Sequence, residues 1–296
     1  MIRRTLFAAA AMASFPMILG TVPASAAIAA PSNLTQMGHI SIQVVGKGSP
    51  VILIPGLSSP RAVWDGVAPE LAKNHKVYLV QVNGFAGDAP RDNLIPGLLD
   101  GVVAELHAYI ADQKLQGAAV VGHSMGGLVS LMLARAHRQD IGRLMIVDSL
   151  PYIGALFMPD ANIKAIEPTA AAMRDKMAAG YGKPADVAGA TATANQLALK
   201  PEPRAKVAAW AQASDPRVTA LAFYEDMTTD LRTDMAAIAV PITLIYPASP
   251  RADALYHAEY AKAPHMTYVP VADSAHFVML DQPEAFRAAL TAFLAG

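Results

Sequence analysis

Hydrophobic positions along the chain alternate between short continuous apolar runs and longer stretches in which apolar residues recur at helical spacing. The apolar runs predict strands at 40–45, 51–54, 76–82, 118–121, 144–147, 242–246 and 266–271. The spaced stretches predict helices at 64–73 and 98–113, after residue 124, after 246 and after 283. Strands that alternate with helices form βαβ units, so we expect an α/β fold with a mainly parallel central sheet and helices on both faces.

The alternation stops in the segment 151–240, which is rich in Ala, Met and Pro and contains no convincing strand. We interpret this segment as a helical cap inserted into a core formed by residues 27–150 and 241–296. The insertion follows the strand that ends at Asp148, and ligands of open α/β sheets bind at the carboxyl ends of strands. A lid that faces the substrate is therefore favoured, and a second domain unrelated to the chemistry is the alternative.

The first residues have the pattern of a secretory signal. Arg3 and Arg4 precede an apolar stretch at 6–19, and Ala24-Ser25-Ala26 supplies small residues for cleavage. We predict a bacterial-type signal peptide at 1–26 and a periplasmic or secreted protein with no stable membrane span after cleavage. The alternative is an uncleaved anchor, for which the apolar stretch is short.

Composition narrows the possible functions of this 296-residue chain. The formal net charge is −1 and no tract rich in Lys or Arg is present, which argues against nucleic-acid binding. Hydrophobic residues make up 53% and charged residues 16%, as in a globular enzyme with much buried sheet. The absence of cysteine excludes disulfides, thiolate catalysis and Cys-ligated metals. No His-x-x-x-His pair or carboxylate cluster has ligand spacing, so we expect neither metal nor cofactor.

One serine has the setting that a nucleophile needs. The run Val-Val-Gly-His-Ser-Met-Gly-Gly at 120–127 places Gly-x-Ser-x-Gly between a predicted strand and a predicted helix. Such a turn lifts the hydroxyl of Ser124 clear of the backbone, and its tightness explains the flanking Gly122 and Gly126. The alternative is a glycine-rich loop with a bystander serine.

A serine nucleophile requires a base, and His276 is the candidate among eight histidines. It follows the last predicted strand and precedes the last helix, so it belongs to the same edge of the sheet as Ser124. His123 is adjacent to the serine but points to the other side of the turn, and we interpret it as structural. The other histidines are interpreted as solvated or packed.

Together these segments resemble the α/β-hydrolase superfamily, from about Gly38 to the C-terminus. The resemblance rests on the order Ser124 then His276, the Gly-His-Ser-Met-Gly-Gly loop, and the tail Ala-His-Phe-Val-Met-Leu-Asp-Gln-Pro-Glu-Ala-Phe. The tail is similar to the family pattern Gly-His-x-x-x-x-Glu-x-Pro-x-x-Phe. The resemblance implies that Ser124 is the nucleophile, that His276 is the base, and that the backbone N–H of Met125 is one oxyanion donor.

The resemblance also implies a second oxyanion donor in the loop after the strand 51–54. The family often has His-Gly there, and this chain has Pro55-Gly56 followed by Leu57 and Ser58. The backbone N–H of Leu57 is the expected donor, and Ser58 can add a hydroxyl. Each such donor contributes about 3 kcal/mol in a transition state. The alternative is a plain turn.

The acid of the expected triad is ambiguous. The family usually carries Asp shortly after the strand that here ends at Tyr246, where this chain has Ser249 and Pro250. Asp253 comes later, in the first turn of a predicted helix. Some members of the superfamily place the acid after the preceding core strand, which here ends at Asp148. We favour Asp148, keep Asp253 as the alternative acid, and leave open that neither acts.

These residues predict a serine hydrolase that cleaves carboxylic esters through a Ser-His-Asp triad and an acyl-enzyme. The substrate is expected to be a small apolar ester, because the cap is rich in apolar residues such as Trp210 and Phe223, although these residues would equally form the core of the cap. Amidase, lactonase and acyltransferase activities use the same triad and stay open. A cofactor-free lyase or perhydrolase, and a non-catalytic binding protein on a hydrolase scaffold, are the further alternatives.

Overall fold

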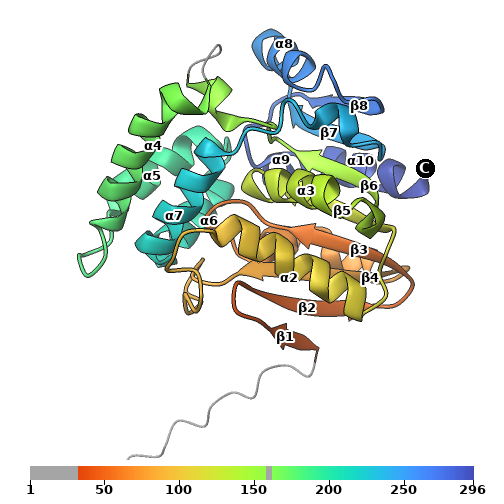
Figure 1. The fold of residues 1–296 in the computed structure, drawn as a ribbon, viewed down its shortest axis with the longest axis horizontal. Coiled ribbons are helices and arrows are strands. Elements are labelled where there is room, and N and C mark those ends of the chain that lie inside the picture. The colour runs from red at the N-terminus through yellow and green to blue at the C-terminus, as the bar shows by residue number, and fades with distance from the viewer. Residues whose placement is uncertain (1–32, 158–161) are drawn as a thin grey trace, which may run out of the picture. The chain divides into compact units, whose positions relative to one another are not determined.

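The computed structural model describes residues 33–157 and 162–296, so the predicted signal peptide at 1–26 lies outside the described residues. Its strands form an eight-stranded sheet in the order β1-β2-β4-β3-β5-β6-β7-β8 (Figure 1). The strands are β1 Leu34–Gln36, β2 Ile40–Gly46, β3 Ser49–Ile54, β4 His75–Val82, β5 Ala118–His123, β6 Ile141–Val147, β7 Ile242–Pro247 and β8 Met266–Val271. From β4 to β8 the pairing is parallel, while β1 and β2 are antiparallel additions at one edge. The predicted α/β class with a mainly parallel sheet is confirmed.

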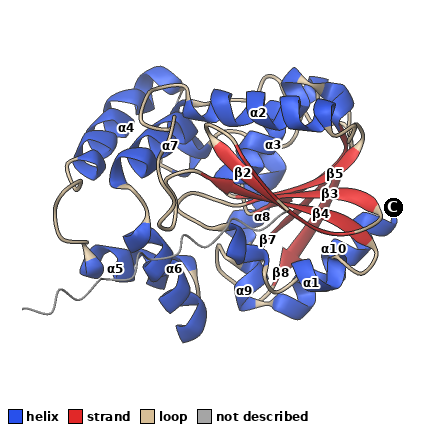
Figure 2. Ribbon diagram, turned by 90° about the horizontal axis from the view of Figure 1, so that it is seen from below, coloured by secondary structure: helices blue, strands red, loops and turns tan. Residues whose placement is uncertain are grey.

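Helices cover both faces of this sheet (Figure 2). They are α1 Ala68–Leu71, α2 Leu98–Asp112, α3 Met125–Ala136, α4 Ile163–Ala178, α5 Val187–Leu197, α6 Pro201–Ala213, α7 Pro216–Thr228, α8 Pro250–Glu259, α9 Val278–Asp281 and α10 Pro283–Ala295. One hydrophobic core lies between the sheet and α2, α3 and α8, and a second lies between the sheet and α1, α9 and α10. Alternate residues of β3 point into opposite cores, which explains why such a strand is apolar throughout its buried part.

The single helix predicted at 64–73 is wrong. The structure has a 3-10 turn at Arg61–Trp64 and a separate four-residue helix, α1. Pro69 has no amide hydrogen to donate to the carbonyl of Asp65, so a continuous helix here would lack one backbone hydrogen bond. Trp64 is instead fully buried, and its ring stacks on Phe286 of α10 at 6.1 Å between centroids.

Between β6 and β7 the chain forms the helices α4 to α7, which we call the helical insertion, and no strand occurs among the described residues of that segment. In this insertion α4 packs along α7, and α5 packs along α6 (Figure 1). Ile166 of α4 and Met227 of α7 form a small core together with Tyr152 and Ala155, which precede the insertion's helices. Within 33–157 and 162–296, no helix has the length and apolar character needed to cross a bilayer.

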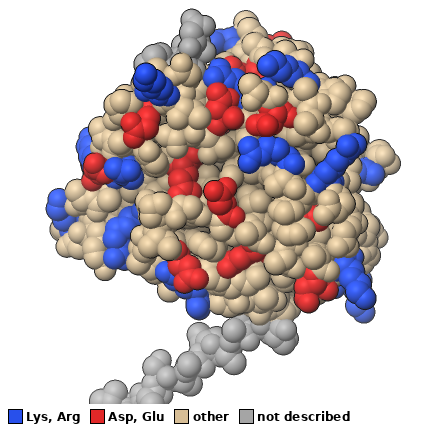
Figure 3. Space-filling view, viewed as in Figure 1, with Lys and Arg blue, Asp and Glu red and all other residues tan. Residues whose placement is uncertain are grey.

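Parallel pairing determines where the candidate residues meet. His123, the last residue of β5, pairs with Val147, the last residue of β6, so Ser124 and Asp148 begin neighbouring loops at one edge of the sheet. β8 continues the same parallel order beyond β7, and the loop that follows it carries His276. On the face shown in Figure 3, acidic and basic side chains are intermixed among a larger uncharged area.

Candidate active site

Ser124 occupies a strained turn between β5 and α3. Its φ of 53° and ψ of −124° are unusual for a residue with a side chain. The flanking glycines are required by space: a Cβ on Gly122 would lie 2.2 Å from the carbonyl oxygen of Gly126, and a Cβ on Gly126 would lie 2.5 Å from that of Ile54. Ser124 is partly exposed and lines a pocket, so the turn presents the serine to a ligand.

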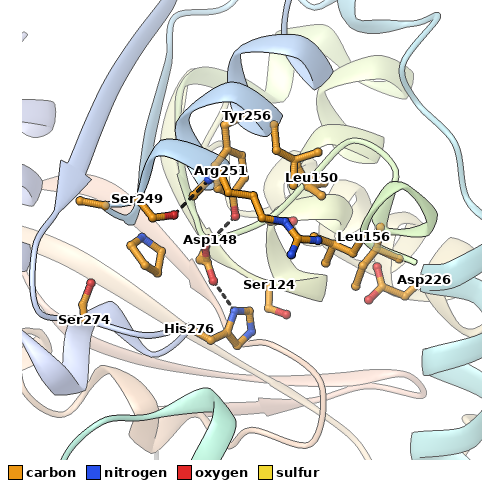
Figure 4. Close-up of a pocket in the computed structure, with 16 residues that line it drawn as sticks. Ser124, Asp148, Leu150, Leu156, Asp226, Ser249, Arg251, Tyr256, Ser274 and His276 are labelled. Atoms are coloured by element: carbon orange, nitrogen blue, oxygen red, sulfur yellow. Dashed lines mark hydrogen bonds and ion pairs between the residues drawn. The ribbon is translucent and has the colours of Figure 1, made fainter. Parts of the chain in front are cut away.

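His276 and Asp148 form a close pair beside this serine. His276 Nδ1 lies 2.5 Å from Asp148 Oδ2, and the imidazole lies beside both Asp148 and Ser124 in Figure 4. Within the described part of the chain, no hydrogen bond joins the Ser124 hydroxyl to the imidazole. Catalytic hydrogen bonds of this kind often tighten only when substrate binds. The structure therefore brings together the three residues favoured from the sequence.

The alternative acid, Asp253, faces another partner. It lies in the first turn of α8, as expected, and accepts a hydrogen bond from the hydroxyl of Tyr246. Ser249, near the position where the family usually has its acid, caps α8 by accepting from the amide of Ala252. The carboxylate in contact with His276 is thus Asp148 and not Asp253.

Tyr256 is a site residue that the sequence did not reveal. Its hydroxyl donates to Asp148 Oδ1 at 2.6 Å, so each carboxylate oxygen of Asp148 has a partner. Burial, and then the negative charge of Asp148, raise the pKa of Tyr256 well above its usual value, which keeps the phenol protonated as a donor. In the sequence Tyr256 is one apolar position of a helix, and only the packing of α8 beside the end of β6 shows its contact.

The backbone amides of Met125 and Leu57 are the oxyanion donors expected from the sequence. Met125 begins α3, and Leu57 lies in the loop after β3. Among the residues that the structure describes, neither amide donates a hydrogen bond. A Cβ on Gly56 would lie 3.0 Å from the Cβ of Ser124, so the loop that carries Leu57 lies directly against the serine. Unpaired N–H groups beside a nucleophile are the donors that an oxyanion requires.

The hydroxyl of Ser58 lies elsewhere. It is 3.0 Å from Thr219 Oγ1 on α7, so it connects this loop to the helical insertion. Either hydroxyl of this pair can be the donor, so the expectation that Ser58 adds a donor to the oxyanion site stays a prediction.

His123 contacts His276, the candidate base. Its side chain is fully buried, and its Nε2 lies 3.1 Å from the backbone carbonyl oxygen of His276. Burial, and then the charge of His276, lower the pKa of His123 well below its usual value, so it is neutral and donates this hydrogen bond. These contacts agree with the structural interpretation of His123.

The pocket above Ser124 has a volume of about 430 Å³. Its apolar wall is formed by Leu150, Ile153, Leu156 and Leu255. Trp210 and Phe223, the apolar cap residues named from the sequence, do not line the pocket. Trp210 packs on Phe277, and Phe223 packs against the core of the α4–α7 pair. The apolar wall was expected, but other residues form it.

Two charged side chains in the same wall were also missed from the sequence. Arg251, near the start of α8, is exposed, and Asp226, in the last turn of α7, is 4% exposed. Burial raises the pKa of Asp226 to about 7, although the charge of His276 acts in the opposite direction. No sequence pattern marks either residue, because each reaches the pocket only through the packing of its helix.

A cluster outside the pocket has metal-binding residue types. The ligand atoms of His107, His137 and Asp140 lie within 4.8 Å of one another, and His107 Nδ1 is 2.7 Å from Asp140 Oδ2. The two imidazoles, however, stack face to face at 3.6 Å with 8° between their planes. Ring nitrogens bind a metal in the plane of the ring, so stacked rings cannot both point at one ion. We assign no metal to this cluster.

Comparison with known proteins places the chain among hydrolases. A family model described as "Alpha/beta hydrolase family" matches residues 51–289. The chain is 31% identical over 141 residues to the pimeloyl-[acyl-carrier protein] methyl ester esterase of Aeromonas hydrophila, an alignment that covers 48% of this chain and 52% of that protein. It therefore spans about half the length of that relative.

Two further matches are nearly complete. The chain is 26% identical over 263 residues to the Vibrio cholerae protein of the same name, covering 85% of this chain and 96% of that protein. A crystal structure described as a hydrolase from Pseudomonas aeruginosa PA01 superposes with a TM-score of 0.71 at 20% identity, covering 90% of this chain and 99% of the other. At that identity the structural match establishes the fold alone.

Proposed function

Because the chain belongs to the alpha/beta hydrolase family, we propose that it is a serine hydrolase that cleaves carboxylic esters through an acyl-enzyme. The observation that carries this proposal is the strained Ser124 beside an imidazole whose Nδ1 contacts Asp148 at 2.5 Å. The esterase names of two relatives support the choice of an ester as substrate.

In the proposed first step, Ser124 Oγ attacks the ester carbonyl carbon while His276 Nε2 takes the hydroxyl proton. Asp148 holds the imidazole by its Nδ1–H and stabilises the imidazolium that forms. The amides of Met125 and Leu57 bind the negative oxygen of the tetrahedral intermediate.

In the proposed later steps, His276 donates the proton to the leaving alcohol as the C–O bond breaks, which leaves an acyl group on Ser124. Water then attacks this acyl group while His276 takes a proton from the water. Collapse of the second intermediate releases the carboxylic acid and returns the proton to Ser124. No cofactor is needed at any step.

The helical insertion supports a role as a lid, which we propose as part of the same function. Asp226 of α7 lines the pocket together with Ser124 and His276 of the core. A substrate in this pocket would thus contact both the insertion and the sheet edge, and the apolar wall would hold its apolar part.

Rates of 4-nitrophenyl ester hydrolysis test the proposal. Replacement of Ser124 by Ala is expected to lower kcat by roughly 10⁶-fold, as for the loss of a serine nucleophile elsewhere. Ser49→Ala, at an exposed serine, is the matched control and should leave the rate unchanged. Matched amides, lactones and acyl-acceptor alcohols identify which acyl transfer is fastest. Undiminished ester hydrolysis by Ser124→Ala would refute the mechanism.

Export is a separate proposal. Residues 1–26 carry the charge, apolar and small-residue pattern of a signal peptide, and we propose that cleavage occurs after Ala26. N-terminal sequencing of the protein from a fractionated bacterial host tests it. Recovery of the intact N-terminus in the cytoplasmic fraction would contradict it.

A further inference from the structure

Asp226 is a buried carboxyl group in the wall of the candidate active site. It belongs to the last turn of α7, is 4% exposed, and lines the pocket together with Ser124 and His276 (Figure 4). Among the described residues its carboxyl group accepts no hydrogen bond and forms no ion pair. This carboxyl group is therefore available to a ligand in the pocket that it lines.

This isolation is unusual among the buried acidic groups of the molecule. Of the other acidic residues described as buried, Asp140 is paired with His107, and Asp281 accepts hydrogen bonds from the amides of Leu199 and Ala275. A buried carboxylate without partners costs several kcal/mol. The raised pKa of Asp226, about 7, reflects that cost. A group that the chain leaves without a partner, facing a ligand pocket, is suited to receive one from the ligand.

The surroundings favour a positively charged ligand group. Asp226 lies two residues before the end of α7 at Thr228, where the carbonyl groups of the helix give a negative potential. That potential disfavours a carboxylate but attracts a cation. If the ligand offered only a neutral hydrogen-bond donor, the side-chain oxygen of Asn or Ser could accept from it. No acid would then need to be buried. The acid is the residue type that is required when the partner is a cation.

We propose that the carboxylate of Asp226 binds a protonated amine of the substrate, so that the pocket selects esters that carry a cationic group beside an apolar chain. This inference rests on the proposed esterase function, because it assigns the substrate class of the same site. The apolar wall of Leu150, Ile153 and Leu156 would hold the chain between the ester and the amine.

Arg251 lies in the same wall and carries the opposite charge. Its side chain is exposed to solvent, which screens its charge, whereas Asp226 is buried. If the substrate were an anion instead, Arg251 would be its partner. The test therefore includes an anionic substrate.

The test uses 4-nitrophenyl esters whose linear acyl chains end in an ammonium, a methyl or a carboxylate group, at several chain lengths. Each kcat/KM is normalised to hydrolysis of the same ester by hydroxide. The readout is the normalised kcat/KM of the ammonium ester divided by that of the methyl ester of equal length. The chemistry of Ser124 and His276 is common to both esters and cancels in this ratio. At the best chain length we expect a ratio of about 10 or more, as for a net contribution of about 1.4 kcal/mol.

The matched variants isolate the carboxylate. Asp226→Asn should reduce the ratio to about one, because the amide keeps the shape but loses the charge. Asp175→Asn, which removes an exposed carboxylate of α4 in the same insertion, should leave the ratio unchanged.

The pH dependence of the same ratio gives a second readout. In the wild type the ratio should rise as pH increases through about 7, because Asp226 then loses its proton, and it should stay flat in Asp226→Asn. The other charged groups that line the pocket are His276, Asp148 and Arg251. Their effects on bond cleavage are common to both esters and cancel in the ratio.

Several outcomes would overturn the proposal. Hydrolysis of the methyl esters with a ratio near one, or a ratio that survives Asp226→Asn, would remove the cation site and leave the esterase function standing. A preference for carboxylate esters that Arg251→Gln abolishes would assign the charge recognition to Arg251 instead.

If no ester is cleaved, calorimetry with the Ser124→Ala variant still decides the inference independently of catalysis. Hexylammonium should bind more tightly than hexan-1-ol, and the preference should vanish when Asp226→Asn is added. Equal binding of the two probes would refute the cation site.

Discussion

Asp148 lies one residue beyond β6, with a φ of 47°, and this position directs its carboxylate at both His276 and Tyr256. If it is the triad acid, Asp148→Asn should lower kcat by roughly 10⁴-fold, because the amide favours the wrong imidazole tautomer. Asp253→Asn is the matched control and should change kcat little. Steady-state kinetics of both variants tests this, and the reverse ranking would assign the acid to α8.

Tyr256 is expected to act as a positioning residue for Asp148. Tyr256→Phe should lower kcat by about tenfold with little change in KM, since it removes one donor from the carboxylate that holds the base. Tyr260→Phe removes a comparable buried hydrogen bond, from Tyr260 to the carbonyl of Ser149, and serves as the control. A merely structural role for Tyr256 would lower Tm in both variants and leave kcat equal in the two.

Asp226 is expected to reduce the stability of the free protein. Its pKa is raised from an ordinary 3.8 to about 7, so the unfolded state releases the proton first as pH rises. As pH rises from about 4 to about 8, the free energy of unfolding of the wild type should therefore fall by up to about 4 kcal/mol relative to that of Asp226→Asn. Thermal melts of both proteins across this range test it. A difference in Tm that does not change with pH would contradict a buried, unpaired carboxyl.

The site residues that are predictable from the sequence are those that belong to a local pattern. The glycines beside Ser124 are explained by the turn alone, and the structure places backbone oxygens where their side chains would be. Asp148 and Asp253 were both plausible acids because each follows a core strand, and only tertiary contacts distinguish them. Tyr256 and Asp226 carry no local signal, since their roles depend on how α8 and α7 pack over the sheet edge.

At the scale of elements, central parallel strands such as β3 and β5 were predicted well because both of their faces are largely buried and their runs are apolar. The segment β1 escaped prediction because it is three residues long and largely exposed. The helix at 64–73 failed because apolar spacing continues through Pro69, whose missing amide hydrogen interrupts the backbone ladder. The spacing of apolar residues indicates which positions are buried, whereas backbone hydrogen bonding determines whether a helix is continuous.

Asp281 accepts hydrogen bonds from two loops near the site, the one that carries His276 and the one between α5 and α6. It lies at the end of α9 and accepts from the amide of Ala275, next to the base, and from the amide of Leu199 between α5 and α6. Asp281→Ala should lower the free energy of unfolding by about 2–4 kcal/mol, because these N–H groups lose their acceptor. Chemical denaturation measures this. Glu284→Ala, at an exposed carboxylate, should cost less than about 0.5 kcal/mol, and equal losses in the two variants would contradict the role of Asp281.

At the scale of the molecule, the parallel order of the sheet assembles the site. β3, β5, β6 and β8 end at one edge, so four loops far apart in the chain contribute Leu57, Ser124, Asp148 and His276. The helical insertion adds Asp226 to the same pocket. The fold class was predictable because alternation of strands and helices is a property of the whole chain. The chemistry of the pocket wall was not, because it depends on how the insertion packs on the core.

Covalent labelling tests most directly whether Ser124 is the nucleophile. The purified protein is incubated with a fluorophosphonate, which reacts with activated serines, and intact mass is measured for the wild type and for Ser124→Ala. We expect one adduct on the wild type and none on the variant. An unlabelled wild type, or a variant that is labelled equally, would contradict the assignment of Ser124 as the nucleophile.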